Sequence, residues 1–346
     1  MKRVLFPERN NWQNTHQEIG FDYYNLPSRD GSIYWSEGVA YEFSLKQIEQ
    51  LEDASNQLHQ MCLEVAGDLI QRGDYPDYFQ IPHAAIALIE HSWEQKAPML
   101  YGRFDFAYDG QDIKMLEYNA DTPTGLLEAS VAQWHWIEQV ENIPNRDQFN
   151  SIHEALIERW TQLYPRKTTV HFAACQDAGR EDWGNLEYLM DTAFQAGLSV
   201  SELSMENIGW DGQHFVDLHL QQIQHLFKLY PWEWVWEESF AAFLQPQTEW
   251  IEPCWKMLLS NKAILIELWK RYPNHPLLLE THAYDPQQHY AGKWVRKPIL
   301  AREGANIHIV QNNVDCGEAS GSFYFKDYNK YGYVMQRWVK TPLHEG

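Results

Sequence analysis

Apolar and polar residues alternate through positions 103–124 in a way that predicts a β-hairpin with two different faces. One set of alternating positions is apolar. The other set carries Arg103, Asp105, Glu117 and Asn119. Side chains opposite each other in a hairpin share a face, so we expect Asp105 to lie opposite Glu117 and Arg103 opposite Asn119.

The loop of this predicted hairpin contains the turn signal Asp109-Gly110. Because the pairing joins odd-numbered positions, we expect an odd number of loop residues, such as 110–112. The polar face then has two interpretations. Either it simply meets water, as in many antiparallel hairpins, or its carboxylate and amide oxygens hold Mg²⁺ while the arginine binds a phosphate.

The residues after the hairpin favour the second interpretation. Residues 119–125, Asn-Ala-Asp-Thr-Pro-Thr-Gly, are a cluster of turn formers with two hydroxyl groups, and an apolar segment typical of a helix follows. The first turn of a helix has free amide N–H groups that bind anions readily. An anionic substrate would therefore find donors beside the polar face.

The clearest helix in the sequence covers residues 44–72. Ser44 and Gln47 form a capping box at its start. Its apolar stripe consists of Ile48, Leu51, Leu58, Val65 and Leu69. We interpret this helix as scaffold.

A strand followed by a helix predicts an α/β lobe in the middle of the chain. Residues 167–174 are typical of a buried strand, and residues 186–196 of a helix that ends before a glycine. Glu181 and Asp182 fall in the loop expected between them. They are either a solvated acidic turn or carboxylates that project towards a ligand.

The last third of the chain carries two lysines on elements that the pattern predicts. Residues 251–269 are typical of a helix that carries Lys262, and a lone helical lysine is usually a surface residue. Residues 294–300 and 307–310 are expected to be strands joined by a short turn of small residues, with Lys297 on the first of them. This arrangement could fold over a nucleotide triphosphate.

The composition is that of a globular protein with an acidic surface. The chain has 346 residues, of which 44% are hydrophobic, and its 27 basic and 48 acidic residues give a formal net charge of -21. Such a chain can bury a sizeable core in two or three lobes. Its negative field disfavours nucleic acid as a partner and favours cationic substrates such as amines.

Several common classes of protein are not supported by the sequence. The four cysteines form no C-x-x-C pair, and no stretch of eighteen apolar residues suggests a membrane span. The N-terminus lacks the apolar segment of a secretory signal, so we expect a cytoplasmic protein. Signatures of P-loop, zincin and standard α/β-hydrolase sites are also missing from the sequence.

Four stretches of the sequence resemble the synthetase part of the glutathionylspermidine synthase family. These are the hairpin at 101–125, Ser-Asn-Lys-Ala-Ile-Leu at 260–265, Pro-Asn-His-Pro at 273–276 and Lys-Pro-Ile at 297–299. The resemblance extends over about residues 20–338. It implies an α+β fold of the ATP-grasp type with a preceding N-terminal α/β lobe.

The resemblance also implies roles for individual residues. Asp105, Glu117 and Asn119 match magnesium ligands, and Arg103 matches the catalytic cation that holds the reacting phosphoryl group. The other matches are Lys262 and Lys297 at the ATP phosphates, Glu303 and Gly304 in the loop over the nucleotide, Gln336 near adenine, Thr122 and Thr124 at the carboxylate substrate, and Glu181 and Asp182 near the amine.

The resemblance divides the chain into four parts. Residues 1–100 form an N-terminal helical and α+β region, and residues 101–165 contain the hairpin and the helices after it. Residues 166–250 are an inserted α/β substrate lobe, and residues 251–346 a nucleotide-binding ATP-grasp lobe. The family's fused amidase half is missing. The chain also stops at Thr341-Pro342-Leu343-His344-Glu345-Gly346, where relatives continue into further strands, so an incomplete nucleotide lobe is one expectation.

The implied function is that of an ATP-dependent ligase that joins a carboxylate to an amine through an acyl phosphate and releases ADP. The partners would be a peptide or glutathione-like carboxylate and a polyamine or amino acid, with ATP and Mg²⁺ as cofactors. A nucleotide-binding protein with little or no turnover is the alternative. A carbohydrate-binding or carbohydrate-cleaving protein, suggested by paired acids and many tryptophans, would show no magnesium-dependent ATP binding.

Overall fold

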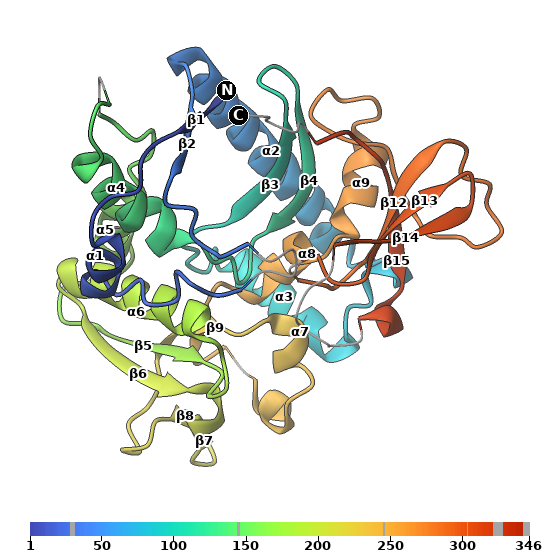
Figure 1. The fold of residues 1–346 in the computed structure, drawn as a ribbon. Coiled ribbons are helices and arrows are strands. Elements are labelled where there is room, and N and C mark those ends of the chain that lie inside the picture. The colour runs from blue at the N-terminus through green and yellow to red at the C-terminus, as the bar shows by residue number, and fades with distance from the viewer. Residues whose placement is uncertain (28–31, 144–145, 245, 303, 321–327, 342–346) are drawn as a thin grey trace.

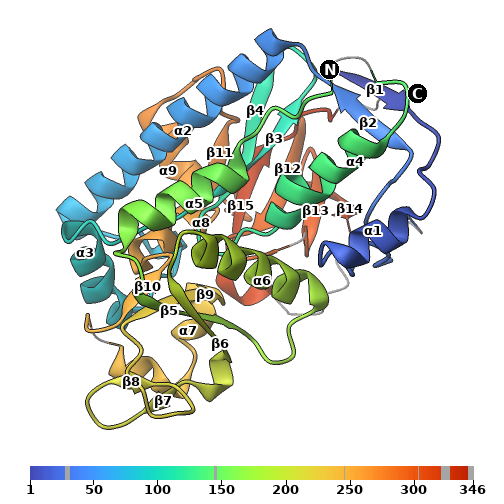
Figure 2. The ribbon, with the colours of Figure 1, turned by 90° about the vertical axis from the view of Figure 1, so that its left-hand side faces the viewer.

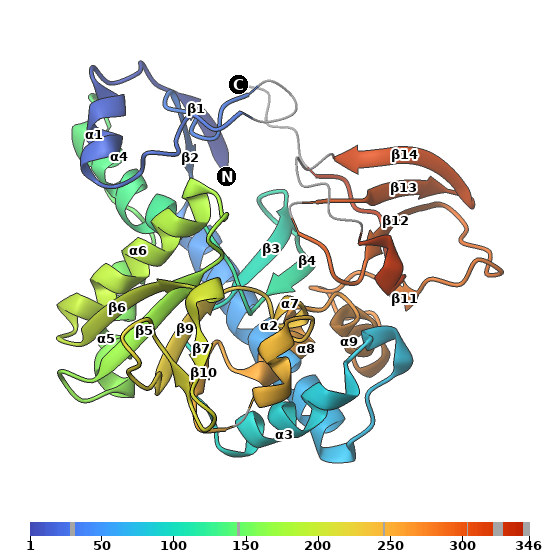
Figure 3. The same ribbon diagram turned by 90° about the horizontal axis from the view of Figure 1, so that it is seen from below.

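The strands in the described part of the chain form a four-stranded sheet, a five-stranded sheet and three two-stranded pairs. One of these pairs is a hairpin that lies between the two larger sheets (Figure 3). The computed structural model describes residues 1–346 except 28–31, 144–145, 245, 303, 321–327 and 342–346. The mixture of helices and sheets agrees with the α+β class expected from the sequence. Glu303 and the chain end at 342–346, which both entered the sequence predictions, lie outside the described residues.

The first sheet is parallel and is covered by helices. Its elements are β5 (Thr169–Ala174), β6 (Ser199–Ser204), β9 (His225–Leu229), β10 (Glu249–Ile251), α5 (Ile152–Leu163) and α6 (Arg180–Gln195). The strand order is β10-β9-β5-β6. Helices α5 and α6 lie side by side against one face, where Trp160 and Phe172 are fully buried (Figure 2). The strand and the helix expected in this part of the chain are confirmed as β5 and α6.

The second sheet is antiparallel. Its strands are β11 (Thr281–Ala283), β12 (Lys293–Pro298), β13 (Ile307–Gln311), β14 (Val314–Ser320) and β15 (Tyr333–Arg337). They follow the order β11-β15-β12-β13-β14. The two strands predicted at 294–300 and 307–310 are confirmed as β12 and β13, which are antiparallel neighbours.

The hairpin consists of β3 (Arg103–Tyr108) and β4 (Ile113–Asn119), and its predicted pairing is confirmed. Arg103 lies opposite Asn119, and Asp105 opposite Glu117. The expected odd-numbered loop is wrong, because Tyr108 pairs with Ile113 and leaves four residues, 109–112, in the loop. A bulge restores the pairing. Asp105 pairs with Glu117 and Phe106 with Met115, so Leu116 is the extra residue.

Helix α2 (Leu45–Arg72) packs along the hairpin and supports it (Figure 1). The capping box is confirmed, since the Ser44 hydroxyl accepts from the Gln47 N–H and the Gln47 amide oxygen accepts from the Ser44 N–H. The Tyr118 hydroxyl of β4 lies 3.0 Å from His59 Nδ1 of this helix. The long helix thus fixes the apolar face of the hairpin.

Two helix boundaries differ from the sequence prediction. Helix α6 begins at Arg180, so Glu181 and Asp182 lie in its first turn and not in a loop. Negative side chains are favoured at this position because the helix N-terminus carries a partial positive charge. Residues 251–269 do not form one helix. They contain the end of β10, the 3₁₀ turn Cys254–Lys256, α8 (Met257–Ser260) and the start of α9 (Ile264–Arg271).

The other α-helices and strands of the described chain, and its π-helix, are smaller elements. They are β1 (Lys2–Leu5), α1 (Trp12–Glu18), β2 (Val39–Glu42), α3 (Ile86–Glu94), the π-helix Glu128–Ala132, α4 (Gln133–Gln139), β7 (Gly209–Trp210), β8 (Phe215–Val216) and α7 (Trp232–Val235). Among the described residues, every helix is too short or too polar to cross a membrane.

His16 of α1 is buried among aromatic rings, and this predicts a pH-dependent stability. Burial, and secondarily Arg9, lowers the pKa of His16 from 6.5 to about 4. Between these two pH values the His16 imidazole is protonated in the unfolded chain and neutral in the folded chain. The contribution of His16 to the free energy of unfolding should therefore be fully present above pH 6.5. It should fall by about 3 kcal/mol as the pH drops to 4. Urea unfolding of the wild type and His16→Phe across this range measures the difference, and parallel pH profiles would contradict it.

Candidate functional site

The polar face of the hairpin holds charged groups of both signs. Because residues two apart share a face, Arg103, Asp105, Glu117 and Asn119 all project on the same side. The Arg103 guanidinium donates from Nε to Asp105 Oδ1 at 2.8 Å and from Nη1 to the Thr124 carbonyl at 3.2 Å. The structure therefore brings together the four residues singled out in the sequence.

Lys262 reaches this face from the segment between α8 and α9. Its Nζ lies 3.1 Å from Glu117 Oε2 and donates to the Ala301 carbonyl at 2.7 Å. The prediction that Lys262 sits on a helix is wrong. The Asn261 side chain accepts from the Ala263 N–H at 2.9 Å, a local bond that competes with those of a helix. It also donates to the carbonyl of Phe79, which is distant in the sequence, at 2.7 Å. The break in the helix turns the lysine towards the hairpin.

Lys297 of β12 connects the antiparallel sheet to the hairpin. Its Nζ donates to the carbonyl of the bulge residue Leu116 at 3.1 Å and to Gln336 Oε1 at 2.7 Å. Gln336 of β15 also donates to the Met115 carbonyl at 3.3 Å. The bulge frees a carbonyl from the ladder, and Lys297 and Gln336 meet at this point.

Burial and the neighbouring charges shift the pKa values of two side chains at the site. Burial alone would raise the pKa of Glu117, but Lys262, Lys297 and then Arg103 outweigh it and hold this pKa below its usual value. Burial, assisted by Lys262, lowers the pKa of Lys297 to about 8, although Glu117 opposes the shift. Glu117 is thus ionised at neutral pH, and Lys297 remains mostly protonated.

The predicted substrate residues meet where the loop after β4 approaches α6. The Thr124 hydroxyl donates to Glu181 Oε1 at 3.0 Å, and Asp182 follows in the same helical turn. The Thr122 hydroxyl is buried without a hydrogen-bond partner among the described residues. Asn185 of α6 accepts from the Gly125 and Leu126 N–H groups at 3.0 and 2.9 Å, which anchors the loop.

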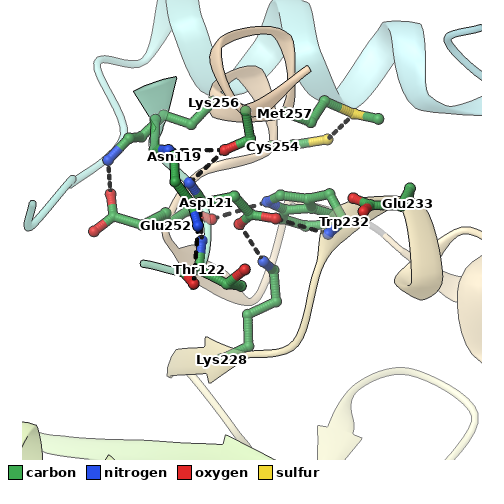
Figure 4. A network of polar contacts seen from close by, with 12 residues as sticks. Asn119, Asp121, Thr122, Lys228, Trp232, Glu233, Glu252, Cys254, Lys256 and Met257 are labelled. Atoms are coloured by element: carbon green, nitrogen blue, oxygen red, sulfur yellow. Dashed lines mark hydrogen bonds and ion pairs between the residues drawn. The ribbon is translucent and has the colours of Figure 1, made fainter. Parts of the chain in front are cut away.

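Sequence reasoning missed the other anchors of this loop. Ser260 Oγ accepts from the N–H groups of Ala120 and Asp121 at 2.8 and 2.7 Å. The Asp121 carboxylate binds Lys228 Nζ and the backbone N–H of Trp232 (Figure 4). The polar Ser260 and Asp121 stand inside recognised motifs, but no local pattern connects Lys228 with a residue so distant in sequence.

The oxygen donors of the polar face fit a hard divalent cation. Asp105 and Glu117 supply carboxylates and Asn119 an amide oxygen, which is the chemistry that Mg²⁺ prefers. In the part of the chain that the structure describes, no three His, Cys, Asp or Glu side chains group to hold a metal. The predicted loop residue Gly304 lies in the turn after β12 with φ of 69°.

Comparison of the sequence with known proteins gives a consistent set of relatives. The family model described as "Glutathionylspermidine synthase preATP-grasp" matches residues 3–346. A protein of Haemophilus influenzae named "Putative acid--amine ligase" is 50% identical, and the match covers 100% of this chain and 90% of that protein.

More distant relatives are longer proteins. "Trypanothione synthetase" of Crithidia fasciculata is 26% identical over 90% of this chain and 51% of its own length. The "Bifunctional glutathionylspermidine synthetase/amidase" of Escherichia coli (strain K12) is 25% identical over 84% of this chain and 50% of its own length. The chain thus spans about half of these two synthetases.

A solved structure resembles the whole fold. It is a "glutathione synthetase like-effector" from Globodera pallida, which aligns with a TM-score of 0.54 at 10% identity. The alignment covers 98% of this chain and 85% of the effector. At this identity the likeness concerns the fold alone.

Proposed function

The chain belongs to the glutathionylspermidine synthase family, and on this premise we propose that it is an ATP-dependent carboxylate-amine ligase that forms ADP. Its relatives are acid-amine ligases and synthetases by name. One observation carries the proposal. Arg103 and Lys262 form ion pairs with Asp105 and Glu117, and the charge of Lys297 acts on Glu117 from a third segment. These cations gather although the chain as a whole has a charge of -21.

The cations at the site suit the phosphoryl transfer that this chemistry requires. A carboxylate and an ammonium ion are stable as a salt in water, so amide formation needs an activated acid. An oxygen of the carboxylate attacks the γ-phosphorus of ATP, the bond to the bridging oxygen breaks, and ADP leaves. The neutral amine nitrogen then attacks the acyl carbon, the bond to the phosphate oxygen breaks, phosphate leaves, and the nitrogen releases one proton to solvent. Positioning and charge neutralisation drive phosphoryl transfer, and the two lysines and Arg103 supply both.

The hairpin side chains that carry oxygen donors would bind the metal. Asp105, Glu117 and Asn119 would hold Mg²⁺, which would neutralise phosphate charge when bound. Arg103 would fork onto the transferred phosphoryl group, and Lys262 and Lys297 would contact the phosphates. The loop containing Gly304 would cover the nucleotide, with Gln336 towards the adenine side.

We assign the two organic substrates to the region between the loop after β4 and α6. The hydroxyls of Thr122 and Thr124 would face a peptide or glutathione-like carboxylate, and the buried, unpartnered Thr122 hydroxyl supports this assignment. Glu181 and Asp182 would attract a polyamine or amino acid through their negative charge.

The arrangement of sheets supports an ATP-grasp reading of the fold. We propose that residues 251–346 form the nucleotide-binding lobe around the antiparallel sheet, and that residues 166–250 form the substrate lobe around the parallel one. Residues 101–165 with the hairpin would lie between them, and residues 1–100 would form the preceding lobe. We place the reaction in the cytoplasm.

The proposal is tested by measuring ADP release from Mg²⁺ and ATP with a panel of carboxylates and amines, followed by mass spectrometry of the products. We expect ADP release that requires both an acid and an amine, and a product whose mass equals their sum minus water. Tight ATP binding with no acceptor-dependent ADP release from any pair would instead identify a nucleotide-binding protein without turnover.

The low pKa of Lys297 predicts how nucleotide affinity depends on pH. The protonated lysine attracts phosphates, so ATP affinity should be high below pH 8 and fall about tenfold towards pH 9 as the proton is lost. Calorimetry with Lys297→Met should show weaker binding and a flat profile over this range. Lys293→Met, on the same strand, is the control. Equal pH profiles for Lys297→Met and the wild type would contradict the assignment.

A further inference from the structure

The last residue of β4 and the loop after it, residues 119–124, carry one proposed metal ligand and both proposed carboxylate contacts, with Asp121 in the middle of this stretch. The Asp121 side chain is turned into the protein and is fully buried. Its Oδ1 accepts from Lys228 Nζ at 2.7 Å and its Oδ2 from the Trp232 N–H at 2.8 Å (Figure 4). Both carboxylate oxygens therefore accept hydrogen bonds within the protein, and we assign neither of them to substrate binding.

Lys228 is equally enclosed. It lies on β9 with a fully buried side chain, and its Nζ sits 4.5 Å from the centre of the Trp232 ring. Trp232 is the first residue of α7. Asp121 thus ties the loop to two elements at once, the central β9 of the parallel sheet and the short helix that follows it.

Stability alone does not account for an ion pair in this place. Removing two charges from water costs about as much free energy as their attraction returns, and apolar residues of the same volume often hold a core equally well. An ion pair with a second hydrogen bond does, however, fix direction. A carboxylate that must satisfy Lys228 and the Trp232 N–H can take few orientations, so its backbone is held in one place.

The backbone fixed in this way leads directly to the site. Ser260 Oγ binds the N–H groups of Ala120 and Asp121 from the other anchor, two residues before Lys262. Among the residues that the structure describes, the Asn119 side chain makes only long hydrogen bonds of 3.4 Å, to the N–H and the carbonyl of Thr122. The placement of the Asn119 amide therefore depends on the anchors of its neighbours.

We propose that Asp121 and Lys228 are positioning residues that set the Asn119 amide and the Thr122 hydroxyl relative to the carboxylates of the hairpin. The proposal rests on the ligase function proposed above. On this proposal, replacing the pair lowers metal affinity and turnover more than it lowers the stability of the fold.

The test exchanges the ion pair for a neutral amide pair. In Asp121→Asn/Lys228→Gln, hydrogen bonding between the two side chains can persist without buried charge, so we expect the protein to fold. Affinity for Mn²⁺ in the presence of ADP, measured by electron paramagnetic resonance, should fall about tenfold, as should kcat at saturating ATP. The half-saturating Mg²⁺ concentration should rise with it.

A matched control uses a second buried ion pair outside the site. Arg9 and Glu37 lie 2.6 Å apart with side chains 5% and 1% exposed. Arg9→Gln/Glu37→Gln should leave Mn²⁺ affinity and kcat unchanged whatever its effect on the melting temperature. A structural role for both pairs would produce parallel losses of stability and no selective loss of metal affinity.

A second variant keeps the proposal falsifiable if the amide pair does not fold. Asp121→Glu retains the charge and adds one methylene, which should shift the loop and weaken Mn²⁺ binding. Folded variants with wild-type Mn²⁺ affinity and kcat would overturn the positioning role even if the ligase reaction is confirmed. A wild-type protein that binds Mn²⁺ and ADP but releases no ADP from ATP would overturn the ligase function, while the affinity comparison would still decide the positioning role. Absence of both binding and turnover would overturn both proposals.

Discussion

Glu117→Gln should reduce magnesium-dependent ATP turnover by about 1,000-fold, which corresponds to about 4 kcal/mol of transition-state stabilisation. The side chain keeps its size but loses the charge that faces Lys262 at 3.1 Å. It also changes from an anionic oxygen ligand to a neutral one. The loss should appear in kcat/KM measured across a range of Mg²⁺ concentrations.

Asp112→Asn is the matched control for this change. Asp112 lies exposed in the four-residue loop of the same hairpin, and its N–H bonds to the Asp109 carboxylate. The substitution removes one negative charge from the hairpin without touching the polar face, so turnover should remain at the wild-type level. Turnover by folded Glu117→Gln within about tenfold of the wild type would rule out a metal role for Glu117.

The hairpin shows what an alternating pattern of apolar and polar residues can and cannot predict. Alternation determines which residues share a face, and this was enough to place Arg103 opposite Asn119 and Asp105 opposite Glu117. The loop length was wrong because parity arguments assume a regular ladder. A bulge at Leu116 adds one residue to β4, and the Leu116 carbonyl accepts a hydrogen bond from Lys297. That contact spans two segments far apart in the sequence.

The predicted helix boundary was wrong where the Asn261 side chain makes hydrogen bonds to backbone both near and distant in the sequence. The apolar pattern of residues 251–269 continues through the break between α8 and α9, since Leu258, Leu259, Ile264 and Leu265 are all buried. The bonds of Asn261 to the Ala263 N–H and the Phe79 carbonyl interrupt the helix without disturbing that pattern. For the same reason, periodicity gave no sign that Lys262 leaves the helix and approaches Glu117.

The anchors of the site could not be predicted because they join distant elements. Asp121 belongs to a recognisable motif, but its partner Lys228 lies on a strand that otherwise reads as apolar core. Gln336 meets Lys297 because β15 pairs with β12, an order of strands that the sequence does not reveal. Local patterns therefore identified the candidate site residues. The residues that anchor them could not be identified, because they depend on the topology of the sheets.

Arg103→Lys should lower kcat by about 100-fold or more and change the KM for ATP much less, because the guanidinium acts on the phosphoryl group in the transition state. Arg103 now forks onto Asp105 and reaches the Thr124 carbonyl, a geometry that a lysine cannot reproduce with its single ammonium group. Steady-state kinetics with ATP as the varied substrate separate the two parameters. Arg180→Lys in α6 is the control, since its side chain is 44% exposed like that of Arg103 and is also paired with carboxylates. If Arg103→Lys kept kcat within about threefold of the wild type, the planar fork would have no part in phosphoryl transfer, and charge alone would explain the site.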